Sequence, residues 1–354
     1  MAYNHEIFGQ RLKSAREMRG LSMADLSQEL EGIVTRQAIC KYEAGKMLPD
    51  STVLIRLARI LGVKTDYFFR PFTVALSGIE FRKKSTMSVK SGKSVQQMVL
   101  DKVERYFEIE EICGLEHNSS PIRNNPVISK KDDVIALAAS IRKEWGLGSD
   151  GITDVIALLE TKGIKVVEVE SDDNFDGLSG KAGDCFVIVL NKSQLHPERK
   201  RFTALHELGH LVMRFDPAIS DKEKESFCHL FASEFLIPQS SFKDILGDLG
   251  KGNLNLFSFA DIQRAYGISI DAQIRKARDA GMISESRYKS YFIRKRQSRK
   301  FQAFVDRVLT EDEAPQRFQT LVYDAYAKNI ISVSKAASLL NTSVEEVLST
   351  AVFV

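Results

Sequence analysis

Two histidines and a glutamate stand together in the middle of the chain, in the order His206-Glu207-Leu208-Gly209-His210. On a helix, residues four apart project from one face about 6 Å apart along the axis, so both imidazoles can hold one Zn²⁺. Glu207 is turned toward the same cleft, where it can take a proton from a zinc-activated water. This spacing predicts the zinc site and the general base of a metallopeptidase.

The alternative for this motif is an ordinary amphipathic helix with its polar residues in solvent. The residues around the motif are largely apolar, which predicts a buried helix. Because burying an unpaired histidine costs free energy, the metal site is the stronger interpretation.

The segment that follows offers a third ligand, since a catalytic zinc usually has three protein ligands and an open position. At ~100° per residue, Glu225 and His229 lie only ~40° apart around a helix axis. Glu223 and Glu234 point roughly to the other side of Glu225. The spacing therefore leaves two alternatives for the third metal ligand, Glu225 and His229. The one that does not bind the metal is expected to lie beside the ligands.

Short strands and two helices are expected to position these groups. Pro197 starts the helix that carries the motif. Ser220 and Glu223 have capping-box spacing and open the next helix, which stops before Pro238. Turns rich in Gly or Asp separate three predicted strands: Ile164–Val169, Phe175–Gly180 and Cys185–Leu190.

Two stretches of this region carry a family resemblance. Arg201-Phe-Thr-Ala-Leu-His-Glu-Leu-Gly-His210, followed by Glu225-Ser-Phe-Cys-His-Leu-Phe-Ala-Ser-Glu-Phe-Leu-Ile-Pro238, resembles the ImmA/IrrE family of zinc metallopeptidases. The resemblance covers about residues 130–238, although Ile237 stands where the family often has Met. It implies a zincin-like α+β fold and Zn²⁺ as cofactor. It also implies Glu225 as third ligand, with His229 as the alternative or neighbouring group.

The N-terminal region holds a separate signal. Two predicted helices, Ser22–Leu30 and Thr35–Ala44, are joined by a tight turn that contains Gly32. This is the helix-turn-helix layout, in which the second helix enters the major groove of DNA and its first residues contact base edges. The sequence therefore predicts a DNA-reading helix that begins at Thr35.

Side chains suited to DNA recognition follow from this placement. Thr35, Arg36 and Gln37 occupy the base-reading positions, where Arg matches guanine and Gln matches adenine. Lys41 and Lys46 are the predicted phosphate contacts. Residues 1–70 carry eleven Lys and Arg against eight Asp and Glu, a modest bias toward a polyanion. The alternative is a protein-binding helical bundle with solvated charges.

This region also carries a resemblance. Ala38-Ile-Cys-Lys-Tyr-Glu43-Ala-Gly45-Lys-Met-Leu-Pro49 is similar to the Cro/lambda-repressor (XRE) domain, and the match extends over residues 7–70. Cys40 replaces the usual Ser. The resemblance implies operator DNA as partner, bound by a homodimer.

Length and composition set the frame for both sites. The 354 residues predict two or three domains, and 44% apolar with 27% charged residues is typical of a globular chain. The chain lacks an apolar run near 18 residues and an N-terminal secretory signal. Its four cysteines are scattered, which fits a reducing compartment. We expect a cytoplasmic protein with no membrane partner.

The predicted fold is multidomain and mainly α. An all-α helix-turn-helix bundle (1–70) precedes a linker with a helix (71–129). An α+β, zincin-like metallopeptidase domain with a small sheet (130–240) and an α-helical C-terminal region (241–354) follow.

Two functions are compatible with these features. The first is a DNA-binding transcriptional regulator with a zinc-dependent endopeptidase domain that cleaves a repressor or another regulatory protein, Glu207 being the base. The second is a DNA-binding repressor or antitoxin whose zinc domain is a non-catalytic sensor or binds a partner such as a toxin. The presence of Glu207 favours catalysis, because a purely structural zinc needs no base.

Overall fold

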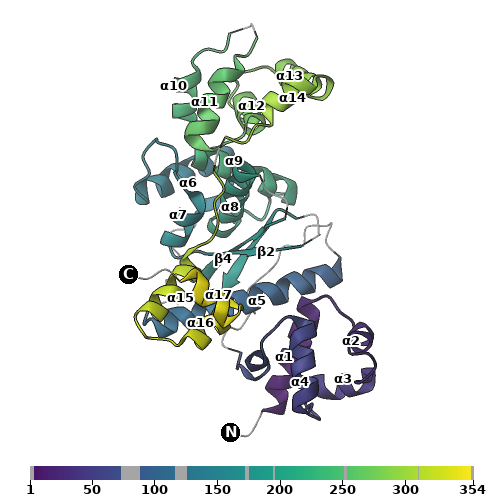
Figure 1. Ribbon diagram of the computed structural model, residues 1–354. Helices are drawn as coiled ribbons and strands as arrows, with labels where there is room; N and C mark the ends of the chain where they lie inside the picture. Colours follow the sequence, from purple (N-terminus) through teal and green to yellow (C-terminus); the bar gives the residue numbers. More distant parts are fainter. Residues whose placement is uncertain are drawn as a thin grey trace.

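The computed structural model describes residues 4–72, 88–115, 126–171, 175–193, 196–250, 253–309 and 311–351. Residues 73–87, which belong to the expected linker (71–129), lie outside this part of the chain. Helices dominate, and small sheets occur in the middle region, which confirms the predicted mainly α class (Figure 1). Among the described residues, no helix combines the length and the apolar character that crossing a bilayer requires.

The N-terminal bundle forms around side chains that recur at helical spacing. Phe8, Leu12, Leu57 and Phe68 are fully buried in one apolar core. Arg16, in the helix His5–Met18, forms a bidentate ion pair with Glu43, in the helix Arg36–Glu43. The elements are α1 (His5–Met18), α2 (Met23–Glu29), α3 (Arg36–Glu43), α4 (Ser51–Leu61) and the 3-10 helix η1 (Thr65–Phe69).

The central sheet has the strand order β2-β4-β3. Strand β2 (Lys165–Val169) runs parallel to β4 (Cys185–Asn191), and β3 (Gly177–Ala182) pairs antiparallel with β4. Strand β3 extends two residues beyond its expected end at Gly180, because a two-residue hairpin with Gly183 at positive φ lets Ala182 pair with Cys185. Strand β3 therefore forms one edge of the sheet, next to α8 (Pro197–Val212).

Helices cover both faces of this sheet. Along β4, Phe186, Ile188 and Leu190 point into the core that contains α8, whereas Val187 and Val189 pack against α5 (Val89–Ile112). The helix that the sequence predicts within the linker thus covers one sheet face. The remaining elements of this region are β1 (Val127–Ile128), α6 (Lys131–Glu144), α7 (Val155–Thr161), β5 (Arg214–Phe215) and α9 (Asp221–Leu236).

The C-terminal residues form two groups of helices that pack on different partners. The first group extends the core of α8 and α9 as far as Val305. The chain then returns along α8 to the second group, which packs on the C-terminal half of α5 (Figure 1). The first group comprises α10 (Gln239–Leu246), α11 (Leu256–Tyr266), α12 (Ile270–Asp279), α13 (Glu285–Gln297) and α14 (Arg299–Val305). The second comprises α15 (Arg317–Ala327), α16 (Val333–Leu340) and α17 (Val344–Thr350).

A buried carboxylate joins three of these layers. Glu110 on α5 lies 2.5 Å from Lys165 on β2 and 2.5 Å from Arg317 on α15. Two opposite charges satisfy this carboxylate inside the protein, where an unpaired one would be costly. The sheet, α5 and the last helices are therefore held in one arrangement.

Candidate functional site

Two packed helices carry the predicted metal ligands. Pro197 occupies the first turn of α8, where its missing N–H costs nothing, and Leu205 and Leu208 bury the helix in the core. The capping box of Ser220 and Glu223 begins α9 as the sequence predicts. Since α8 and α9 pack side by side, the first half of α9 faces the His-Glu-Leu-Gly-His motif.

Three side chains converge between these helices. The Nε2 atoms of His206 and His210 are 3.2 Å apart. One carboxylate oxygen of Glu225 lies 3.2 Å from His206 Nε2, and the other lies 3.3 Å from His210 Nε2. The three side chains each offer one ligand atom, and these atoms all lie within 4.8 Å of one another.

These separations fit a zinc ion. With Zn–N and Zn–O bonds of about 2.0–2.1 Å, two ligand atoms of a tetrahedron lie about 3.3 Å apart. The Nε2–Nε2 distance of 3.2 Å matches such an edge, and each imidazole has its own Glu225 oxygen at 3.2–3.3 Å. The histidine side chains are buried, whereas the Glu225 side chain is 51% exposed, so the centre opens toward solvent on the α9 side.

The electrostatics of the cluster suit a cation. Hydrogen bonds from His206 and His210 hold the pKa of the Glu225 carboxyl well below its usual range, despite partial burial. The carboxylate is therefore deprotonated at neutral pH, which is the form that binds a metal.

Glu207 is held on the same helix by a residue of the sheet. Its side chain is buried and accepts a hydrogen bond of 2.7 Å from Ser179 Oγ on β3. Strand β3 approaches this closely because residue 177 is glycine. A Cβ there would come within 2.6 Å of Thr203 Cγ2 and 3.1 Å of Glu207 Cγ. Sequence reasoning assigns no role to Ser179, because only the packing of β3 against α8 brings it to Glu207.

We expect Ser179→Ala to lower the kcat for peptide hydrolysis by about tenfold or more, with little change in KM. A hydrogen bond to a charged group contributes about 1.5–3 kcal/mol, and here it orients the carboxylate that we expect to act as the general base. Steady-state rates at saturating substrate measure the effect, with zinc content as the control. An unchanged kcat would exclude this positioning role.

Two further residues of α9 contact the histidines. The His229 ring lies 4.4 Å from the His206 ring, centroid to centroid, and stacks on Phe202. Within the described residues it does not join the cluster of ligand atoms around Glu225. Cys228 is fully buried, with its Sγ 3.3 Å from His210 Nδ1. A contact at the far nitrogen fixes the ring orientation that directs Nε2 toward the centre.

The predicted DNA-contacting residues lie together on the N-terminal bundle. Thr35 caps α3 by accepting a hydrogen bond of 3.2 Å from the Ala38 backbone N–H. Ile39 and Tyr42 bury the opposite face of this short helix. The predicted contacts are all exposed: Thr35, Arg36, Gln37, Lys41 and Lys46. The surface of α3 is thus available to a groove of DNA.

Comparisons with known proteins agree with these two regions. A model of the helix-turn-helix family matches residues 12–68. A model of the IrrE N-terminal-like domain, a peptidase family, matches residues 160–277. The chain thus carries an XRE-type helix-turn-helix domain followed by an ImmA/IrrE-like peptidase domain, as its motifs predict.

One relative supports the first domain. This is an SPbeta prophage-derived uncharacterized HTH-type transcriptional regulator, YonR, of Bacillus subtilis (strain 168). It is 42% identical to this chain over 64 residues, which make up 18% of this chain and 57% of the relative. The similarity therefore covers about a fifth of this chain.

Proposed function

We propose that this protein is a transcriptional regulator whose second domain is a zinc-dependent endopeptidase, and that it cleaves a repressor or another regulatory protein. One observation carries the proposal. Three side chains offer ligand atoms within 4.8 Å of one another, and the buried carboxylate of Glu207 lies on the same helix as two of them. A regulator that only sensed a metal would have no use for a carboxylate at that place.

In this proposal His206, His210 and Glu225 hold the metal. Zinc bound there would supply Lewis-acid chemistry, polarising the scissile carbonyl and easing deprotonation of a water. Glu207 accepts the water proton and delivers it to the leaving amine, and Ser179 keeps its carboxylate in place.

The sheet supplies a place for an extended substrate. Strand β3 pairs with β4 on one side and forms the edge of the three-stranded sheet on the other. Because a sheet edge presents unpaired backbone groups, a peptide can add to it as a further strand. Ser179 on this strand would then bring the bound peptide close to Glu207. Comparing the cleavage products of the wild type and Glu207→Gln tests the peptidase part of the proposal.

We expect Arg36→Ala and Gln37→Ala each to weaken specific DNA binding by about 1–3 kcal/mol and to relax the preference for one base pair. Both side chains are exposed at the start of α3, where they reach base edges. Binding site selection followed by fluorescence anisotropy measures affinity and specificity. Arg59→Ala is the matched control, since Arg59 is exposed on α4. Equal losses for Arg59→Ala and Arg36→Ala would contradict the assignment.

A further inference from the structure

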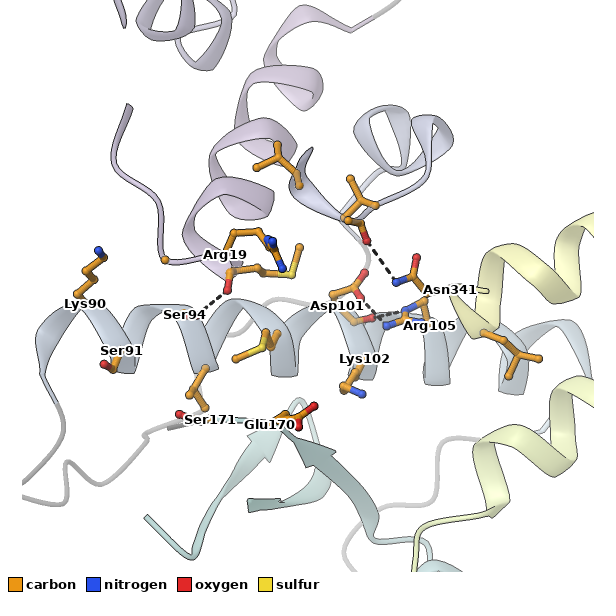
Figure 2. Close-up of a pocket in the computed structure, with 18 residues that line it drawn as sticks. Arg19, Lys90, Ser91, Ser94, Asp101, Lys102, Arg105, Glu170, Ser171 and Asn341 are labelled. Carbon is orange, nitrogen blue, oxygen red and sulfur yellow. Dashed lines mark hydrogen bonds and ion pairs between the residues drawn. The ribbon is translucent and has the colours of Figure 1, made fainter. Parts of the chain in front are cut away.

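A polar groove of about 860 Å³ lies where four parts of the chain meet (Figure 2). One wall is the helix-turn-helix domain, through the ends of α1 and α4, and the floor is one side of α5. The end of β2 and the end of α16 complete it. Its volume falls within the range of about 300–1,000 Å³ that is typical of small-molecule sites.

Two hydrogen bonds join the walls along the groove. Ser94 Oγ on α5 donates to the Met18 carbonyl oxygen at 2.6 Å, and Asn341 Nδ2 donates to the Gly62 carbonyl oxygen at 3.4 Å. Figure 2 shows these bonds well apart along α5. The groove is therefore built by the present arrangement of the DNA-binding domain on the rest of the chain.

The charges that line the groove are mainly positive. Arg19, Lys90, Lys102 and Arg105 line the groove together with two carboxylates, Asp101 and Glu170 (Figure 2). Asp101 forms an ion pair with Arg105, with 2.6 Å between Asp101 Oδ2 and Arg105 Nη2. Among the described residues, no carboxylate lies within 4 Å of the charged nitrogens of Arg19, Lys90 or Lys102. Glu170 is the remaining carboxylate of the lining, and Asp25 and Glu168 act on Lys90 and Lys102 from outside it.

The spacing of these cations limits the ligand. Lys90 and Lys102 are twelve residues apart on α5, or roughly 18 Å, and Arg19 reaches in from the opposite wall. Ser91 and Ser171 add hydroxyl groups between them. A phosphate group, with two charges and three acceptor oxygens, matches ammonium, guanidinium and hydroxyl donors. No aromatic side chain lines the groove within the described residues, so nothing there is built to stack on a base.

We infer that this groove binds a small organic phosphate and that the bound molecule controls how the DNA-binding domain sits on α5. A ligand that contacts both Arg19 and Lys102 stabilises the arrangement that brings them together. If that arrangement binds DNA with a different affinity, the ligand and DNA change each other's affinity by the same factor. This site is separate from the proposed peptidase centre.

Calorimetric titration of the full-length, zinc-loaded protein with fructose 1,6-bisphosphate tests the inference, because the probe carries two phosphates on a small frame. The wild type should bind the bisphosphate and show no binding of unphosphorylated fructose. Lys102→Ala should weaken binding at least tenfold, and Lys102→Arg should restore most of it. Lys93→Ala is the matched control, because Lys93 is exposed on the same helix outside the groove.

Three results would overturn the inference. The first is no binding of the bisphosphate at 10 mM, and the second is an equal loss in Lys93→Ala and Lys102→Ala. The third is a loss of DNA affinity in Lys102→Ala without any probe, with a weaker salt dependence, since the groove would then hold DNA phosphates instead. Glu207→Gln should bind the bisphosphate as the wild type does, so the outcome does not depend on the peptidase proposal.

Discussion

Replacing Glu207 with glutamine will reduce proteolysis by at least about 100-fold while leaving the protein folded and zinc-loaded. General-base catalysis contributes about 10²–10⁴ to a rate, and glutamine cannot accept the water proton. The amide keeps the size of the carboxylate, and its oxygen can still accept the hydrogen bond from Ser179 Oγ. The substitution therefore removes the proton acceptor without opening a cavity around Gly177 and Thr203.

Mass spectrometry of new protein N-termini in cells that express either form measures this effect for any substrate that the cell contains. We expect peptide ends that occur with the wild type and are lost with Glu207→Gln, including any within the chain itself. Zinc content and DNA affinity serve as controls, because neither should change. Identical sets of ends in both strains would exclude catalysis and favour a regulator whose metal domain senses or binds a partner.

The ligand geometry within one helix can be predicted because it is local. His206 and His210 are four residues apart, so any α-helix brings their rings to one face. The same periodicity narrows the third ligand to two residues of α9. Choosing between them requires the packing of α8 on α9, which brings Glu225 to both Nε2 atoms and His229 against the ring of His206.

Contacts made by the sheet and the linker helix cannot be predicted in the same way. Ser179 reaches Glu207 across 28 residues of sequence, through the antiparallel pairing of β3 with β4. The glycines of β3 give a weak strand signal, although Gly177 is what permits the close approach to α8. The helical periodicity of α5 is evident, but its apolar face does not reveal that its partner is a sheet.

Removing the Glu225 carboxylate with Glu225→Ala will weaken zinc binding by more than about 100-fold, whereas His229→Ala will leave it nearly unchanged. Loss of a group that hydrogen-bonds to a ligand typically costs about 10–100-fold, and loss of a ligand should cost more, whereas His229 packs its ring against the His206 ring. Competition with a chromophoric chelator, together with elemental analysis, measures both variants. We expect one zinc per chain in the wild type, because the described residues offer one such cluster.

Cys228→Ala provides an intermediate case that separates ligands from their supports. Its sulfur contacts the far nitrogen of His210, so its loss should weaken zinc binding by about 10–100-fold without removing a ligand atom.

Chelator treatment of the wild type should also lower the melting temperature, because the proposed metal joins α8 to α9 and binds the folded state alone. If His229→Ala strips the metal and Glu225→Ala retains it, the third ligand is His229. The carboxylate would then stay beside the two imidazoles as a neighbouring acceptor of their hydrogen bonds.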